Sequence, residues 1–248
     1  MLDRGEAALQ DGDNIQAASL LLQSKLLAEQ SGHPDLVYIA DIDLGSVYFN
    51  LDEVGESMYY FQEALALVEQ EEMDWEHRFS AMNGVAGSYF RLKDYKRAKE
   101  MLDQCLEAAL NEQDSVAIVD FAMNLVRITT RQNNQQQALY YDSTMHAYLT
   151  PAYAHQVREY LSDVEMEMYY NQNRYDKARS LANYLLDSAD FASGRSAALY
   201  TLCCMAQHDG DYAEALRLAR EALRNSSFSR RRTLYDLMGN IYQQMGQQ

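Results

Sequence analysis

The chain of 248 residues is poor in the two residues that most often interrupt helices. It contains 2 prolines and 11 glycines, fewer than a typical globular protein of this length. This scarcity disfavours an architecture of many short strands and tight turns, and it favours long helices joined by short polar turns. Because 48% of the residues are hydrophobic, such helices can bury a sizeable core. The sequence therefore predicts an all-α protein.

Cysteine and long apolar runs are also scarce. Cys105, Cys203 and Cys204 are too few and too irregularly spaced for a disulfide framework or a zinc site, so we interpret them as small core residues. Unpaired thiols slightly favour the cytoplasm over a bacterial periplasm, which is the alternative. No apolar run approaches the roughly 18 residues of a membrane span, and the N-terminus lacks the pattern of a signal peptide. We expect no membrane insertion by this segment.

Positive charge is in short supply. The chain has 21 Lys and Arg against 37 Asp and Glu, a formal net charge of −16. Nucleic-acid affinity depends on Lys and Arg contacts with phosphate, so we expect no nucleic-acid binding by this segment, and a basic partner fits better. The basic run Arg230, Arg231 and Arg232 is interpreted as a solvated turn between helices.

Sequence motifs of catalysis and of metal or cofactor binding are absent. None of the five histidines stands four residues from another, and no H-E-x-x-H occurs, so we expect no metal and no cofactor. The glycines of residues 83–88 resemble a phosphate-binding loop, but the following Lys is missing and the segment falls in a predicted helix. We expect no enzyme; the alternative is a helical-repeat enzyme that uses Asp163 and Glu167.

What the chain does contain is a repeat of about 40 residues. Each unit has a small residue at an equivalent position. From the second unit onward, an anchor residue stands nine positions before this small residue. The small residues are Ala18, Ser57, Ala98, Ala138, Ala178 and Ala215, and the anchors are Tyr48, Tyr89, Thr129, Tyr169 and Ala206. The constant offset predicts rigid hairpins, whereas the variable distance between units, 37 to 41 residues, places the extra residues in the connections.

Helical periodicity agrees with this organisation. In the third unit apolar residues recur at one face of a helix: Ala98, Leu102, Cys105, Leu106 and Ala109. Turn-favouring residues precede the second helices, and Asp94 and Asp211 are predicted to cap them. We expect the anchors Tyr48, Tyr89 and Tyr169, together with Tyr242, to fill the core.

The units resemble tetratricopeptide repeats, whose pattern is W-x2-L-G-x2-Y followed by a small residue and an aromatic residue. The clearest unit carries Leu44, Gly45, Tyr48, Ser57 and Phe61. No unit has the early Trp or the closing Pro, and the spacing exceeds the family's usual 34 residues or so. The resemblance implies a right-handed α-solenoid of stacked antiparallel helix pairs that binds a protein or peptide in a concave groove.

The domain organisation that follows is one solenoid over residues 1–248. Its units are predicted near 1–33, 34–73, 74–113, 114–150, 151–191 and 192–226, with a partial unit over 227–248. The fourth unit is the most degenerate, with Thr129 for Tyr, Gln135 for the turn aromatic and Asp142 where Phe belongs, so drift, a kink or a functional irregularity is expected there.

The last predicted helix has no second helix to pack against. It carries a set of apolar residues that a solenoid end would not expose: Leu234, Leu237, Met238, Ile241 and Tyr242. We expect the chain to be a segment of a longer protein. A homodimer formed through the exposed solenoid end is the alternative.

The resemblance places the partner groove on the first helix of each unit. The expected residues are Asn83, Phe90 and Arg91; Asn124, Arg127 and Arg131; Asp163, Glu167, Tyr170 and Asn171; and Tyr200, Gln207 and His208. Asn side chains can bond a peptide backbone, and Arg can bind a carboxylate with both nitrogens. Similarity to repeat regions of bacterial regulatory proteins implies a sensing or docking role, with self-association as the alternative.

Overall fold

The computed structural model describes residues 1–187, 192–224 and 228–246. Over this part of the chain helices are joined by short turns and no strand occurs, which confirms the predicted all-α class. The chain divides into two compact units, Met1–Ala117 and Ile118–Gln248, called unit 1 and unit 2 below. A single continuous solenoid over both units stays a prediction.

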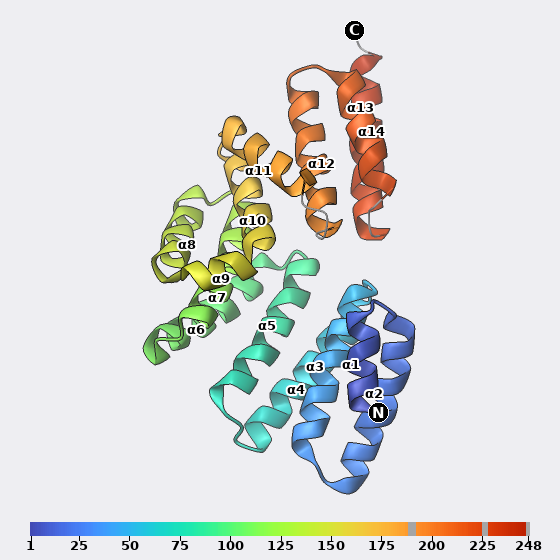
Figure 1. Ribbon diagram of the computed structural model, residues 1–248, viewed down its shortest axis with the longest axis vertical. Helices are drawn as coiled ribbons and strands as arrows, with labels where there is room; N and C mark the ends of the chain where they lie inside the picture. Colours follow the sequence, from blue (N-terminus) through green and yellow to red (C-terminus); the bar gives the residue numbers. More distant parts are fainter. Residues whose placement is uncertain (188–191, 225–227, 247–248) are drawn as a thin grey trace. The chain divides into compact units, whose positions relative to one another are not determined.

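Unit 1 consists of three helical hairpins in chain order. Consecutive helices lie side by side and run in opposite directions (Figure 1). The helices are α1 (Leu2–Gln10), α2 (Asn14–Ser31), α3 (Pro34–Asn50), α4 (Val54–Gln70), α5 (Trp75–Arg91) and α6 (Tyr95–Glu112). The first helices of neighbouring hairpins also touch, α1 against α3 and α3 against α5, which is the stacking expected of a helical repeat.

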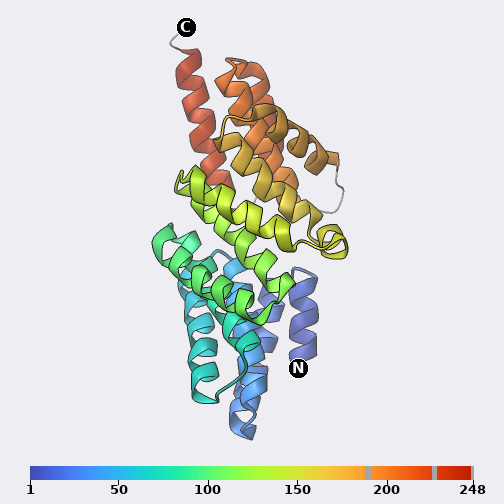
Figure 2. The same ribbon diagram turned by 90° about the vertical axis from the view of Figure 1, so that its left-hand side faces the viewer.

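Unit 2 continues the alternation, and Figure 2 shows its helices from a second side. The helix α7 (Ser115–Arg131) begins in the last residues of unit 1 and lies mainly in unit 2. The others are α8 (Gln135–Tyr148), α9 (Pro151–Gln156), α10 (Arg158–Asn171), α11 (Tyr175–Asp187), α12 (Ala192–His208), α13 (Tyr212–Arg224) and α14 (Phe228–Met245).

Every turn inside the six hairpins that the structure describes has the same backbone conformation. A residue with positive φ stands two positions before the second helix: Gly12, Asp52, Lys93, Asn133, Asn173 or Gly210. The next N–H donates to the carbonyl five residues earlier at 2.9 Å, and the acceptors are Ala8, Tyr48, Tyr89, Thr129, Tyr169 and Ala206. This is the hydrogen-bond pattern of a Schellman motif. The anchor residues of the repeat are therefore the acceptors, which explains their constant offset.

One position of the predicted register is wrong. The small residue assigned to the first unit was Ala18, but the residue nine positions after the acceptor Ala8 is Ala17. Ala17 is fully buried, whereas Ala18 is partly exposed. With Ala17 the first spacing becomes 40 residues, so the first hairpin has the same geometry as the others.

The predicted helix caps are confirmed. Asp94 Oδ1 accepts from the backbone N–H of Arg97 at 3.2 Å, and Asp211 Oδ1 accepts from that of Glu214 at 3.0 Å. Each bond satisfies a donor that the first turn of a helix leaves unpaired, and such a cap typically stabilises a helix by about 1 kcal/mol.

The closest helix crossings in unit 1 surround the ring of Phe61. A Cβ atom added to Gly45 would lie 2.6 Å from this ring, and one added to Gly84 would lie 2.3 Å from it. The α4 ring is therefore held between α3 and α5 by two residues that lack a side chain. This confirms that the small residues mark close packing, and residues 83–88 belong to α5 rather than to a loop.

The irregularity of unit 2 lies one hairpin later than expected. In the fourth predicted unit α7 is a continuous helix, and the hydroxyl of the buried Thr129 donates to the carbonyl of Leu125 at 2.7 Å. The first helix of the next hairpin is instead divided into α9 and α10 at Val157, whose backbone is non-helical (φ −100°, ψ 11°).

The last helix packs more fully than the sequence suggested. Leu234 and Ile241 are fully buried, and Leu237 and Met238 pack partly against the same cluster of α12 and α13. Tyr242 is predicted to fill the core but is 49% exposed, and its hydroxyl accepts a hydrogen bond from Arg220 Nη2 on α13 at 3.0 Å. The basic run was interpreted as a turn between helices, but it lies in α14. Arg231 and Arg232 are exposed as expected, and the side chain of Arg230 lies outside the described residues.

Candidate functional site

The predicted groove residues of unit 2 lie on neighbouring first helices, where they bind one another. Arg127 Nη2 on α7 is 2.8 Å from Asp163 Oδ2 on α10, and Arg131 Nε forms an ion pair with Glu167 Oε1 one helical turn further on. The Arg residues expected to receive a partner's carboxylate therefore already have carboxylates from the same unit. Their use by a partner stays a prediction.

The side chain of Arg127 is held by several neighbouring groups of α7 and α10. Burial acts to lower the pKa of its guanidinium, but Tyr160, Asp163 and Glu167 act the other way and raise it. The guanidinium lies 4.7 Å from the centroid of the Tyr160 ring, and Tyr160 donates to Asn124 Oδ1 at 3.1 Å. Its Nε atom is buried without a hydrogen-bond partner among the described residues. Arg127 thus joins α7 to α10 by charge and by stacking.

Two predicted tyrosines converge on a cysteine at the next pair of first helices. The side chains of Tyr170 on α10 and Tyr200 on α12 hydrogen-bond with Cys204, whose thiol pKa is raised by burial. Burial likewise raises the pKa of Tyr200 to about 12. These groups stay protonated at neutral pH, so they offer hydrogen bonds but neither a nucleophile nor a base.

The remaining predicted residues of unit 2 also have partners within it. The backbone carbonyl of Asn171 accepts a hydrogen bond from Gln135 Nε2 at 3.4 Å. The Nε2 atom of Gln207 donates to Gln244 Oε1 at 2.9 Å. His208 is exposed, with its ring 5.3 Å from that of Tyr175.

In unit 1 the three predicted residues lie on α5. Arg91 Nη1 is 3.2 Å from Asp52 Oδ1, and its guanidinium lies 4.3 Å from the centroid of the Phe49 ring on α3. Phe90 packs partly against Tyr95, with ring centroids 5.5 Å apart, while the Asn83 side chain is exposed. Arg91 thus contacts α3 and the turn that follows it, whereas Phe90 contacts the first residue of α6. Their use by a partner is still a prediction.

A hollow that the sequence did not reveal lies in unit 1 where α2, α3 and α4 meet. It has a volume of about 660 Å³. Its lining includes four carboxylates, Glu29, Asp41, Glu63 and Glu71, beside the ammonium of Lys25. The side chains come from three helices, α2, α3 and α4, and from the turns that follow α2 and α4, so no local motif could signal the hollow.

The charges in this hollow are unequally compensated. Lys25 Nζ is 2.6 Å from Oδ1 of the buried Asp41. Burial still raises the pKa of Asp41 to about 6 against the opposing effect of Lys25. Glu29, Glu63 and Glu71 are exposed, and Lys25 reaches Glu29 at 3.9 Å. Because Lys25 lies closest to Asp41, its positive charge mainly neutralises that carboxylate. The three glutamates therefore give the hollow a net negative charge.

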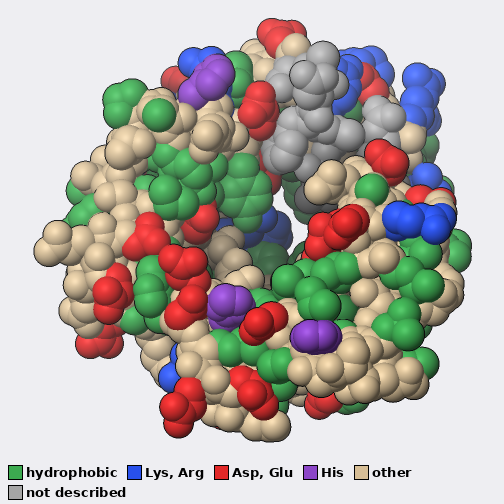
Figure 3. All heavy atoms as spheres, turned by 60° about the horizontal axis from the view of Figure 1, so that its bottom comes forward, with side chains coloured by type: hydrophobic (Ala, Val, Ile, Leu, Met, Phe, Trp, Pro, Cys, Tyr) green, Lys and Arg blue, Asp and Glu red, His purple; other side chains and the backbone are tan. Residues whose placement is uncertain are grey.

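The two units differ strongly in charge. Residues 1–117 contain 23 Asp and Glu against 8 Lys and Arg, while residues 118–248 contain 14 against 13. The acidity of the chain therefore belongs to unit 1. On the face drawn in Figure 3 the acidic side chains are widely scattered. The acidic hollow combines negative charge with a concave shape.

Among the helices of the described residues, none is long and apolar enough to cross a membrane.

Comparison with known proteins supports the family resemblance. Residues 36–111 match the family model described as tetratricopeptide repeat. The whole structure is similar to the crystal structure of a tetratricopeptide repeat protein from Parabacteroides merdae ATCC 43184, with 12% sequence identity, 97% of each chain covered and a TM-score of 0.59. At this identity the likeness shows the fold alone, and no curated protein matches the chain. Residues 36–111 are thus similar in sequence to tetratricopeptide repeats, and the described residues share the fold of a tetratricopeptide repeat protein.

Proposed function

We propose that this chain is a non-catalytic scaffold that binds a basic, extended segment of a partner protein at the acidic hollow of unit 1. Tetratricopeptide repeats are generally scaffolds for protein–protein interaction, since stacked hairpins offer long concave surfaces. The observation that carries the proposal is the set of exposed glutamates, Glu29, Glu63 and Glu71, around one hollow.

The hollow suits a Lys or Arg side chain in two respects. Its carboxylates can take charge-assisted hydrogen bonds from an ammonium or guanidinium group. Its apolar lining includes Pro34, Val37 and Leu67, against which the aliphatic part of such a side chain can pack. The charge of unit 1 would also attract a basic partner over a distance and speed its association at low salt.

Fluorescence anisotropy with a labelled Arg-rich peptide, and with a Glu-rich peptide of the same length, tests this proposal. We expect binding of the Arg-rich peptide alone. The triple variant Glu29→Gln, Glu63→Gln, Glu71→Gln should raise its Kd at least about tenfold, a loss of about 1.4 kcal/mol.

A matched variant separates the hollow from the general charge of unit 1. Glu69→Gln, Glu107→Gln, Glu112→Gln removes the same charge from exposed positions outside the hollow, and we expect a change in Kd of no more than about threefold. Equal losses in the two triple variants would refute the hollow as the site. Weakening by Asn124→Ala and Gln207→Ala instead would place the partner on the first helices of unit 2.

Self-association through α14 is a second candidate function. One face of this helix exposes Tyr235 (61%), Tyr242 (49%) and Met245 (44%), and such residues are enriched in interfaces between proteins. Light scattering should then show a mass that rises with concentration and falls back to that of a monomer in Tyr235→Glu, Met245→Glu. The control Tyr140→Glu changes a tyrosine that is also 61% exposed, on α8. A monomer at all concentrations would remove this candidate.

A further inference from the structure

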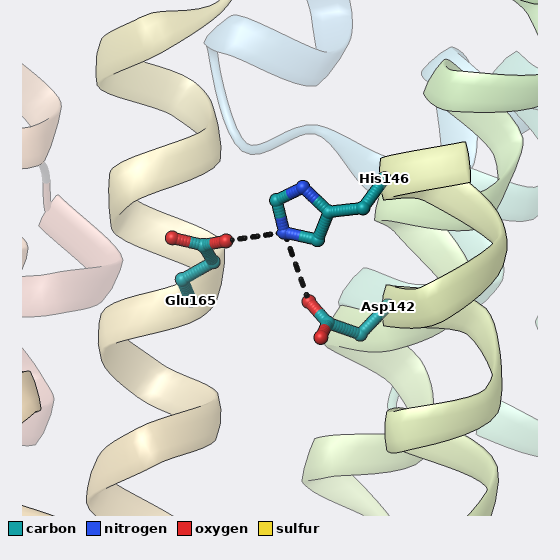
Figure 4. A group of neighbouring side chains, drawn as sticks. All are labelled: Asp142, His146 and Glu165. Atoms are coloured by element: carbon teal, nitrogen blue, oxygen red, sulfur yellow. Dashed lines mark hydrogen bonds and ion pairs between the residues drawn. The ribbon is translucent and has the colours of Figure 1, made fainter. Parts of the chain in front are cut away.

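Three side chains of metal-ligating type meet in unit 2 (Figure 4). Asp142 and His146 come from α8, and Glu165 comes from α10. His146 Nε2 is 2.8 Å from Glu165 Oε1 and 3.7 Å from Asp142 Oδ1. One ligand atom from each residue lies within 4.8 Å of the others. Figure 4 shows the imidazole edge pointing between the two carboxylates.

The local structure explains this convergence. Asp142 and His146 are four residues apart and therefore share one face of α8. Asp142 stands four residues after Ala138, as Phe61 stands four residues after Ser57. In unit 1 that position sends an aromatic ring towards the next hairpin, whereas in unit 2 it sends a carboxylate towards α10. The degenerate residue of the fourth unit thus places an acid where the repeat ordinarily packs an apolar group.

A second, independent observation is the state of the Asp142 carboxylate. Its Oδ1 atom is buried and has no hydrogen-bond partner among the described residues, although it is the oxygen that faces His146. A buried carboxylate oxygen without a partner is costly. The side chains of Asp142 and Glu165 are 16% and 14% exposed, whereas that of His146 is 46% exposed. A cation between them would satisfy the buried oxygen and remain open to solvent on the histidine side.

We propose that Asp142, His146 and Glu165 bind a divalent transition-metal ion, with Zn²⁺ as the representative ion. One imidazole nitrogen and two carboxylate oxygens suit zinc, which commonly takes three protein ligands and one water molecule. At metal–ligand distances of about 2.0–2.1 Å, tetrahedral ligand atoms lie about 3.3 Å apart. The observed 2.8 and 3.7 Å lie on either side of this value, and the ligand atoms of the two carboxylates lie within 4.8 Å of each other.

Protons compete with the metal ion for the side chains of His146 and Asp142. The hydrogen bond with Glu165 raises the pKa of His146, with Asp142 adding to the effect against burial. Burial raises the pKa of Asp142, which Arg174 and Lys177 oppose. Because the metal requires neutral imidazole and ionised carboxylates, its binding should weaken as the pH falls from 8 towards 5.

Two nearby positive charges offer a further test. Removing one of them should strengthen zinc binding only if the three residues bind the metal. Arg174 and Lys177 lie near the Tyr169 ring, 4.7 and 5.1 Å from its centroid, and their charge opposes a metal ion. Lys177→Gln should therefore lower the Kd for Zn²⁺. The metal would connect the second helix of one hairpin with the first helix of the next, so it would stiffen unit 2 and leave the acidic hollow of unit 1 unaffected.

Calorimetric titration of the tag-free, chelator-treated full chain with ZnCl₂ tests the proposal, and the absorption spectrum of the Co²⁺ form reports the ligands. We expect one equivalent of metal per chain and a cobalt spectrum typical of nitrogen and oxygen ligands, without a thiolate charge-transfer band. His146→Gln and Glu165→Gln should each raise the Kd for Zn²⁺ at least about tenfold.

His77→Gln is the matched control, because His77 Nδ1 also contacts a carboxylate, Asp74 Oδ1 at 2.6 Å, but lies in unit 1. It should bind zinc like the unchanged chain, and thermal unfolding with chelator present should show that every variant folds. The proposal is overturned if the unchanged chain binds no zinc up to about 1 mM. It is also overturned if His146→Gln binds as tightly as the unchanged chain, or if His77→Gln loses the site.

Discussion

Units 1 and 2 are built from the same hairpin but carry very different surfaces. Unit 1 has 23 acidic and 8 basic residues, and unit 2 has 14 and 13. Both nevertheless use the same turn, with a positive-φ residue and a 2.9 Å bond from the cap to the anchor carbonyl. The comparison teaches that the fold depends on turns and buried positions, while the surface charge is free to specialise for a partner.

The units also differ in how successive hairpins are joined. In unit 1 the ring of Phe61 fills the space beside Gly45 and Gly84. In unit 2, Asp142 occupies the corresponding position of the second helix α8, and an ion pair between Arg127 and Asp163 joins two first helices. Apolar packing is tolerant of salt and pH, whereas a polar connection responds to both. These polar contacts of unit 2 should therefore respond to salt and to pH.

The largest effect that would test this comparison is expected at Gly84. Gly84→Ala forces a methyl group into the ring of Phe61 and should destabilise the chain by about 3 kcal/mol, measured by urea unfolding. Gly87→Ala on the same helix is the control, because its Cβ would lie 3.6 Å from Phe49. It should be neutral or stabilising by up to about 1 kcal/mol. Similar losses in both variants would show that the packing at Phe61 is not special.

A smaller effect is expected from the polar connection of unit 2. Arg127→Met leaves the partly buried Asp163 without its cation and should cost about 2 kcal/mol, less than the loss for a fully buried pair. Arg131 is 48% exposed, so Arg131→Met should cost less than about 1 kcal/mol. Chemical denaturation of both variants at low and high salt measures the difference. Equal costs would mean that burial does not distinguish the two pairs.

A gain in stability is expected from Asp43 in unit 1. Burial, with Glu6 adding to it, raises the pKa of Asp43 to about 6, and its Oδ2 atom is buried without a partner among the described residues. Since the folded pKa lies above the unfolded value, the charged form destabilises the fold above pH 6, and this cost disappears as the pH falls towards 4. Asp43→Asn should therefore stabilise the chain by about 1–2 kcal/mol at pH 7.5.

The pH dependence of this gain is the decisive measurement. Thermal unfolding of Asp43→Asn and the unchanged chain should differ at pH 7.5 and converge near pH 4. Asp236→Asn, at an exposed position of α14, should stay within about 0.5 kcal/mol of the unchanged chain at both pH values. A gain that persists at pH 4 would contradict the electrostatic explanation.

The smallest effect concerns salt. Repulsion among the acidic residues of unit 1 should be screened as salt rises from about 20 to about 500 mM. Hydrogen exchange followed by mass spectrometry should then slow modestly in α1–α6, while α10–α13 change less or exchange faster as ion pairs weaken. Uniform protection of both units would show that the charge asymmetry does not influence stability.

Much of the fold could be predicted because its signals are local. The repeat of anchors and small residues follows from a turn whose bonds span five residues, and Asp94 and Asp211 cap helices that begin beside them. The error at Ala18 arose because Ala17 and Ala18 are both small, so only burial distinguishes them. The break at Val157 has no comparable local signal.

The candidate sites could be predicted only in part, because their residues meet across helices. First-helix residues such as Arg131 and Glu167 could be named from the repeat, but the ion pair between them depends on how α7 faces α10. The spacing of Asp142 and His146 was available as a signal and was missed, since the third residue, Glu165, comes from another helix.

The amino-acid sequence by itself determined the helical hairpin and, except at Ala18, its register, because turns and buried faces are set by residues a few positions apart. Only the tertiary structure decided which charges are neutralised, where an acidic hollow forms and which side chains converge around a single point. These properties depend on distances between helices, over which electrostatic and coordination energies change within an ångström or two.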